Sequence, residues 1–215
     1  MPLNVSAARK RITKAYGAEL VFSDPLEGSD GAIRHARALI AEEPGRYFYP
    51  DQYSNPSNPR AHMLTTAPEI WEQTDGRVTH FVAGIGTTGT VMGTGHRLKQ
   101  FRRGIEVVAV EPAEAMHGLE GLKHLPSSIV PAIYDARRLD RTLSITTDEG
   151  WAVTERLLKD EGLSVGHSSG ANAAGALAVA RELVARQEKG VVVTVFCDRA
   201  DRYFEPQRPK GRFPW

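Results

Sequence analysis

One stretch constrains the fold more than any other: 78-VTHFVAGIGTTGTVMGTGHRL-98 joins an apolar run to a helix pattern through a glycine-rich turn. The apolar run predicts a buried strand, and the spacing after the turn predicts a helix over 90–101. A second apolar run, 105-IEVVAVEP-112, predicts another strand. Two strands joined through a helix indicate a βαβ unit, with parallel strands and a right-handed crossover.

The rest of the chain continues this alternation. We expect further helices at 31–43, 66–76 and 148–161 and in the later part of 162–190, and further strands at 18–23, 46–50 and 191–197. The last strand, 191-VVVTVFC-197, is almost entirely apolar, which is typical of a strand buried on both faces. Residues 112–142 have a weaker pattern, and 206–215 have none. We therefore predict an α/β fold with a parallel-type sheet and flanking helices.

Two details of this pattern concern side chains and loops. Within the helix at 148–161, Trp151, Leu157 and Leu158 are expected to point inward. The segment 51-DQYSNPSNPRAHM-63 is rich in Asn, Ser and Pro, and we interpret it as a polar loop. A loop of that length inside a compact domain is usually functional or disordered.

Charge and composition exclude several classes of function. The formal net charge of +1 gives no broad basic face, which argues against a nucleic-acid partner. The single cysteine, Cys197, rules out an internal disulfide framework and indicates a reducing compartment. No apolar run approaches the roughly 20 residues that span a bilayer. We expect a cytoplasmic protein without a membrane partner.

The N-terminal segment 1–17 has two interpretations. It is basic and contains no acid, as in a mitochondrial transit peptide. Its apolar residues Val5, Ala8, Ile12 and Ala15 also have helical spacing. We favour a surface helix, because the pattern runs without a break into the strand at 18–23.

The glycine-rich turn is suited to a phosphate. Gly84, Gly86 and Gly89 match G-x-G-x-x-G, and Glu111 lies 22 residues after Gly89, where a dinucleotide-binding enzyme holds a ribose. However, three threonine hydroxyls crowd the turn, at positions 87, 88 and 90. Hydroxyls around three terminal oxygens favour a monophosphate over a diphosphate. A tight turn without a ligand remains the alternative.

A second turn, 166-GHSSGANAAGA-176, opens a helix with two serines. A serine at this position can cap the helix. It can also direct its hydroxyl at a ring nitrogen of a cofactor that lies between the two turns. The segment alone does not separate these two interpretations.

Several long motifs now carry a resemblance. The chain resembles the cysteine synthase family of fold-type II enzymes, which use pyridoxal 5′-phosphate (PLP), and its B-type members above all. The matching stretches are 1-MPLNVSAARK-10, 15-AYGAELVFS-23, 51-DQYSNPSNPRAH-62, 66-TAPEIWEQTDGRVTHFVAGIGTTGT-90, 166-GHSSGANAAGA-176 and 196-FCDRADRYF-204. They occur in the family's order and cover nearly the whole chain.

The resemblance implies a cofactor site. In the family, a glycine- and threonine-rich loop surrounds the PLP phosphate. The resemblance implies that this loop is Gly86, Thr87, Thr88, Gly89 and Thr90. It places Ser168 at the pyridine nitrogen and Gln52 near the substrate carboxylate. A neutral hydroxyl at that nitrogen moderates the electron sink and favours β-elimination and replacement. No metal site is implied.

One departure from the family matters for activity. The family's Schiff-base lysine lies in a Ser-x-Lys-Asp-Arg motif that a Thr-Ser-Gly-Asn-Thr-Gly loop follows, and neither motif occurs here. None of the seven lysines stands in such a motif, so no catalytic residue is identified. We expect an N-terminally truncated chain that binds PLP weakly alone and turns over negligibly. On this basis 1–47 is the remnant of a small N-terminal domain, 48–205 the large PLP-binding domain and 206–215 a loose tail.

Two further residues differ from the family's usual ones. Lys123 falls where B-type members carry basic residues thought to favour larger anionic sulfur donors, but Lys123-His124-Leu125 replaces their Arg-Arg-Trp. An exposed loop lysine is the favoured alternative. His167 replaces an apolar or small residue of the family and is expected to pack beside the cofactor ring.

The resemblance implies synthesis of L-cysteine from O-acetylserine and sulfide or thiosulfate by β-replacement, in a homodimer or together with a missing N-terminal half. A non-catalytic or split-enzyme PLP-binding subunit is one alternative. Another fold-type II enzyme, such as cystathionine β-synthase, is a second. A nicotinamide enzyme is the least favoured, because only the glycine pattern supports it.

Overall fold

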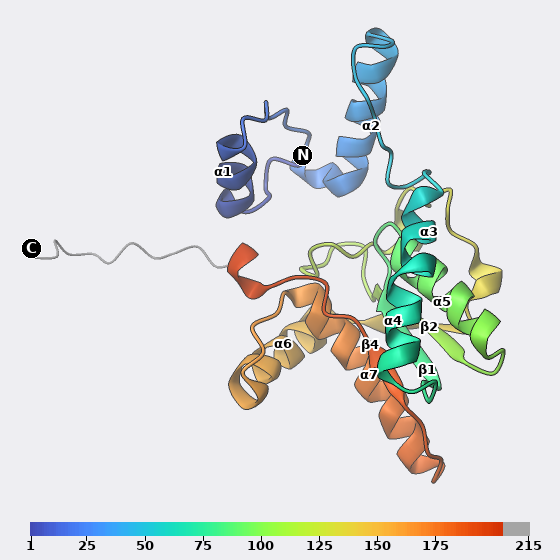
Figure 1. The fold of residues 1–215 in the computed structure, drawn as a ribbon. Helices are drawn as coiled ribbons and strands as arrows, with labels where there is room; N and C mark the ends of the chain where they lie inside the picture. The colour runs from blue at the N-terminus through green and yellow to red at the C-terminus, as the bar shows by residue number, and fades with distance from the viewer. Residues whose placement is uncertain (204–215) are drawn as a thin grey trace, which may run out of the picture. The chain divides into compact units, whose positions relative to one another are not determined.

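The computed structural model describes residues 1–203, which fall into two compact units (Figure 1). The first unit contains Met1–Tyr47 together with the described residues from Arg199 onward, and the second is Phe48–Asp198. The tail predicted at 206–215 lies outside the described residues. In the described part of the chain, no helix is long and apolar enough to cross a membrane.

The first unit is mainly helical. Its elements are α1 (Ala7–Ala15), a 3-10 turn (Pro25–Glu27), α2 (Gly28–Glu42) and a second 3-10 turn (Ala200–Arg202). The helix predicted near the N-terminus is confirmed, and the Ser6 hydroxyl caps it by accepting from the Arg9 N–H at 3.3 Å. The strand predicted at 18–23 was wrong. Only one bridge forms there, between Pro2 and Ser23, because the described part of this unit offers no adjacent strand.

The second unit contains a parallel four-stranded sheet in the order β3-β2-β1-β4. Its helices and strands are α3 (Ser57–Leu64), α4 (Thr66–Gln73), β1 (His80–Gly84), α5 (Gly89–Phe101), β2 (Glu106–Pro112), β3 (Arg141–Ile145), α6 (Thr147–Glu161), α7 (His167–Ala185) and β4 (Val192–Thr194). The predicted βαβ unit is β1-α5-β2, and the α/β fold class is confirmed.

The sheet has an apolar core on each face. Side chains alternate along a strand, so Phe81 and Val107 face one core while Val82 and Val108 face the other. Helices α4 and α5 complete the first core, and α7 completes the second. Helix α6 packs on α7 (Figure 1). Burial on both faces explains why β1 and β2 are continuous apolar runs.

Five expectations for this unit and the residues just before it were wrong. No strand forms at 46–50, which is a turn followed by an irregular segment. The segment interpreted as a polar loop contains helix α3, whose Pro59 is tolerated in the first turn, where the backbone N–H needs no helical acceptor. Strand β3, which begins at the end of the weakly patterned 112–142, was missed. Strand β4 is only half-buried, because it is an edge strand with β1 as its one partner. Trp151 and Leu158 do not point inward, since they are 45% and 41% exposed.

Helix α3 lies unusually close to α5. A Cβ added to Gly93 would lie 2.0 Å from the Pro59 carbonyl oxygen and 3.0 Å from the His62 Cβ. No side chain fits at Gly93 unless α3 moves. This contact fixes α3 over the start of α5, where the glycine-rich turn lies.

We predict that Gly93→Ala destabilises the protein by about 1–3 kcal/mol, the usual cost of overpacking. The direction of this change in stability is informative, because alanine in a helix is ordinarily about 1 kcal/mol more stabilising than glycine. Urea unfolding gives the free energy. Gly104→Ala is the control, because nothing lies within 4 Å of its added Cβ. A Gly93→Ala protein as stable as the wild type would contradict the close contact.

Candidate cofactor site at the carboxyl ends of the strands

Two turns lie beyond the carboxyl ends of the strands, where ligands of open α/β sheets bind. The first joins β1 to α5 through residues 85–88. The second, at Gly166, precedes α7 and is fixed to the chain after β4, because the Gly166 N–H donates to the Asp198 carbonyl at 3.1 Å. The two helices that start here pack on opposite faces of the sheet.

The first turn has an open backbone. Thr88 adopts the left-handed conformation, with φ 72°, which is costly for a β-branched residue. Among the described residues, the N–H groups of Gly86, Thr87 and Thr88 have no protein acceptor. The Thr88 side chain is 2% exposed, and its hydroxyl has no hydrogen-bond partner in the described part of the chain. Such donors at a helix N-terminus are suited to an anion.

Helix α3 holds the other two threonines. The Asn58 Nδ2 donates to the Thr87 hydroxyl at 3.0 Å and to the Gln52 carbonyl at 2.8 Å. One turn later, the His62 Nε2 lies 3.2 Å from the Thr90 hydroxyl, and its Nδ1 lies 2.9 Å from the Thr66 hydroxyl. Burial lowers the pKa of His62, so the neutral ring donates through one nitrogen and accepts through the other.

Sequence reasoning missed the roles of Asn58 and His62. They are four residues apart, which puts them on one face of a helix. The signal was hidden because the segment was interpreted as a loop.

Ser168 lies at the second turn, in the first turn of α7, and is 4% exposed. Its hydroxyl lies beside the Cys197 thiol and acts to lower the pKa of that thiol. Next to it, the Ser169 hydroxyl accepts from the Cys197 N–H at 2.9 Å. Although residue 197 as a whole is exposed, its sulfur lies 3.5 Å from the Asn172 Nδ2, and burial of the thiol together with the nearby Asp198 charge raises the pKa of Cys197. The group beside Ser168 is therefore a neutral thiol at neutral pH.

A loop over 118–123 connects the two turns. The Gly121 carbonyl oxygen lies 2.5 Å from where a Cβ on Gly86 would be, so only glycine fits at position 86. A Cβ on Gly121 would in turn lie 4.0 Å from the Ser168 hydroxyl oxygen. The Lys123 N–H donates to the Ile85 carbonyl at 2.7 Å, which ties the loop to the first turn.

Lys123 itself is not the exposed loop lysine that we favoured. It is 4% exposed, and its ammonium lies 5.2 Å from the centroid of the Tyr53 ring. The sequence gives no sign of this burial, because the bond to Ile85 that draws the loop inward is made by the backbone.

Two other predicted residues are less engaged. Gln52 is exposed, and its main-chain carbonyl is connected to the first turn through Asn58. Its predicted role at the substrate carboxylate stays a prediction. Glu111, the candidate ribose ligand, accepts from the Leu125 N–H at 3.4 Å and so anchors a loop within the protein.

The residues present fit a phosphate ester attached to a neutral heteroaromatic ring. The first turn offers unbonded N–H groups and the buried Thr88 hydroxyl, which would bind the phosphate. Near the second turn, the Asn172 Oδ1 is also buried without a hydrogen-bond partner among the described residues. No group of His, Cys, Asp or Glu side chains in that part of the chain could hold a metal ion.

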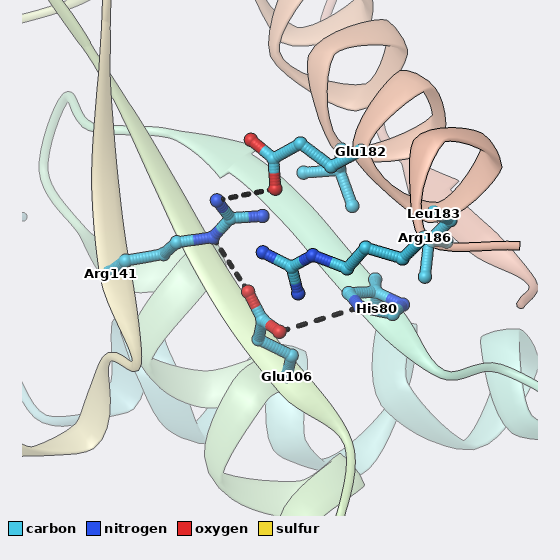
Figure 2. A pocket seen from close by; sticks show the side chains of 7 residues that line it. His80, Glu106, Arg141, Glu182, Leu183 and Arg186 are labelled. Atoms are coloured by element: carbon cyan, nitrogen blue, oxygen red, sulfur yellow. Dashed lines mark hydrogen bonds and ion pairs between the residues drawn. The ribbon is translucent and has the colours of Figure 1, made fainter. Parts of the chain in front are cut away.

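A charged pocket of about 160 Å³ lies at the opposite, amino ends of the strands (Figure 2). Arg141 bridges the two carboxylates of Glu106 and Glu182, at 2.6 and 2.8 Å, and His80 lies 3.4 Å from Glu106. These contacts join three strands and α7. None of the predicted site residues lines this pocket.

We predict that Thr88→Val keeps or raises the free energy of unfolding, by up to about 1 kcal/mol. Valine has nearly the same shape, and it removes a buried hydroxyl that lacks a partner. Chemical denaturation provides the test. A loss of more than about 1 kcal/mol would show that the hydroxyl is bonded within the folded chain.

His62 gives a prediction with a pH dependence. Its pKa is lowered from 6.5 in the folded state, so the unfolded chain binds the proton more readily. Its contribution to stability is therefore present above pH 6.5 and is lost as the pH falls through the folded pKa. His62→Gln should cost about 1–2 kcal/mol at pH 7.5, and clearly less at pH 5.5, in urea unfolding. All other residues are the same in both proteins, so the difference between them isolates His62. A difference that is constant with pH would contradict this role of the ring.

Comparison with known proteins places the chain in a family. Residues 1–198 match the family model described as pyridoxal-phosphate dependent enzyme. The chain is 52% identical over 203 residues to a cysteine synthase of Aquifex aeolicus, and 42% identical over 203 residues to a cysteine synthase B of Pseudomonas aeruginosa. These matches cover 94% of this chain but only 62% and 66% of the relatives.

Solved structures agree with the fold. The O-acetyl serine sulfhydrylase isoform 3 of Entamoeba histolytica matches with a TM-score of 0.83 and 38% identity, over 94% of this chain and 62% of that one. The O-acetylserine dependent cystathionine beta-synthase of Helicobacter pylori matches with a TM-score of 0.86 and 36% identity, over 94% and 67%. The family implies PLP as the cofactor, in agreement with the fit of the two turns. The chain belongs to the family of pyridoxal-phosphate dependent enzymes.

Proposed function

We propose that this chain is the cofactor-binding part of a cysteine synthase, which makes L-cysteine from O-acetylserine and sulfide or thiosulfate by β-replacement. The cysteine synthases among its relatives support the reaction. The main observation in support of the cofactor site is the buried Thr88 hydroxyl, which has no hydrogen-bond partner among residues 1–203.

Each turn has a distinct task in this proposal. The N–H groups of the first turn and the hydroxyls of Thr87, Thr88 and Thr90 bind the phosphate, together with the glycines at 86 and 89. Asn58 and His62 hold two of these hydroxyls in place. No positive side chain is needed, because N–H donors at a helix start stabilise an anion.

At the second turn, Ser168 meets the ring nitrogen. Bound PLP supplies an electron sink for cleavage at the β-carbon of an amino acid. The Ser168 hydroxyl and its Cys197 neighbour are both neutral, so neither adds a charge at that nitrogen. Gln52 orients the substrate carboxylate. We further propose that a lysine-bearing segment outside this sequence supplies the base, and that the 215-residue chain alone turns over negligibly.

We also propose where the enzyme acts and how it assembles. A single cysteine, with no disulfide possible inside the chain, supports a cytoplasmic enzyme. The family supports a homodimer. A separate N-terminal half, or a non-catalytic role as a PLP-binding subunit, is the alternative. Co-purification of this chain with a full-length, lysine-bearing paralogue would favour the non-catalytic role.

The relative from Helicobacter pylori supports a second candidate, an O-acetylserine dependent cystathionine β-synthase. The two reactions differ only in the nucleophile. Supplying sulfide or homocysteine to the active enzyme, and identifying the product by mass, separates them.

We predict that the pure chain shifts the absorption of added PLP, and that Ser168→Ala weakens its binding about fivefold to tenfold, through loss of one buried hydrogen bond. Thr88→Val should weaken it similarly. Absorption titration measures both, with Lys159→Met on the exposed face of α6 as the control. Equal binding by all four proteins would contradict the site.

The same samples test the lysine. Borohydride reduction fixes PLP on any lysine that has formed a Schiff base with it. Intact mass should then show no PLP adduct that is confined to one lysine and lost in Ser168→Ala. Cysteine formation from O-acetylserine and sulfide should stay at the level without protein. Measurable turnover by the pure chain would contradict the proposed need for another segment.

A further inference from the structure

Two aromatic rings stack directly beside Ser168. The Trp151 indole of α6 and the His167 imidazole at the start of α7 have centroids 4.5 Å apart and planes 15° apart. Burial lowers the pKa of His167, which keeps the stacked ring neutral near pH 7. His167 thus packs on a tryptophan of a neighbouring helix.

The stack is joined to the loop over 118–123. The Trp151 Nε1–H donates to the Gly118 carbonyl at 3.2 Å, and the Gly118 N–H donates to the Thr147 hydroxyl at 2.9 Å. Residues of α6 therefore bind both the N–H and the carbonyl of Gly118. The next residue, Leu119, is fully buried.

The stack lies next to a close contact between α6 and α7. A Cβ on Gly170 would lie 2.2 Å from the Gly150 carbonyl and 2.0 Å from the Thr154 hydroxyl. Trp151 follows Gly150, and His167 lies three residues before Gly170. The backbones of α6 and α7 fix how the two helices cross. The two rings connect the end of this crossing near Ser168 to the 118–123 loop.

The consequence concerns the distance between the two turns. Gly121, in the same loop, contacts Gly86 on one side and lies near Ser168 on the other. A loop held on the start of α7 sets how far the phosphate turn lies from the Ser168 hydroxyl.

We propose that the Trp151–His167 stack is a clamp that holds the 118–123 loop on the first turn of α7 and so positions Ser168 for the cofactor ring. The role given to Ser168 rests on the proposed function. Trp151 and His167 are positioning residues, since they act through Ser168 and the loop.

Amide hydrogen exchange of the full chain tests the clamp. Relevant protected amides are those of Gly118, Leu122, Lys123, Ser169 and Gly170, each of which has a hydrogen-bond acceptor. Loss of an aromatic pair is expected to speed their exchange about two- to tenfold in His167→Ala and Trp151→Leu. Amides of β1 and β2 exchange by global unfolding and serve as the reference. The five amides should exchange faster relative to this reference in both variants.

Two matched variants identify the cause. His167→Phe keeps a flat ring and should restore wild-type exchange. Phe101→Leu breaks another aromatic contact in the same unit, with Trp71 at 5.1 Å, and should leave the five amides unchanged relative to β1 and β2. Unchanged exchange in His167→Ala would overturn the clamp, as would equal rates in His167→Ala and His167→Phe.

This result does not depend on cofactor binding. If the wild-type chain binds no PLP, the proposed function fails, while the exchange rates still decide whether the clamp exists. If PLP binds, His167→Ala should weaken it and His167→Phe should not. Equal weakening by both would overturn the positioning role.

Discussion

The contact between α3 and the glycine side of α5 is the constraint on which the phosphate turn depends. Because Gly93 has no side chain, the Pro59 carbonyl reaches the α5 backbone, and α3 cannot slide. Asn58 and His62 then meet Thr87 and Thr90 at hydrogen-bond distance. Thr88 lies between these two threonines in the strained left-handed conformation, and its hydroxyl has no hydrogen-bond partner in the described part of the chain.

The site as a whole is built from neutral donors. The first turn offers backbone N–H groups and hydroxyls, and the second offers a serine beside a thiol that burial keeps protonated. The loop over 118–123 lies against both turns and so fixes the distance between them. Such a site can orient a phosphate ester and leave a ring nitrogen uncharged, which suits β-replacement chemistry. The charged network at Arg141, at the other end of the sheet, instead joins strands to α7.

Much of this arrangement could be predicted from sequence, for a physical reason. Buried parallel strands and the glycine-rich turn leave strong local signals, so β1, α5 and β2 were found with small errors at their ends. The turn before Ser168 was found in the same way. These features depend on residues adjacent in the chain.

The errors share another cause. Helix α3 was missed because Asn and Pro usually indicate loops, whereas here its contact with α5 stabilises it. The burial of Lys123, the exposure of Trp151 and the half-buried edge strand β4 all depend on which distant segment lies alongside. His167 and Trp151 meet only because α6 and α7 cross, and no local pattern reports that.

We propose that the two turns bind one molecule, its phosphate at 86–90 and its ring at Ser168. Backbone amide NMR of the chain titrated with PLP, and separately with inorganic phosphate, tests this most directly. We predict that phosphate shifts only the amides of 86–90, while PLP shifts these and also those of 168–170. Shifts from PLP that spare either turn would contradict the account.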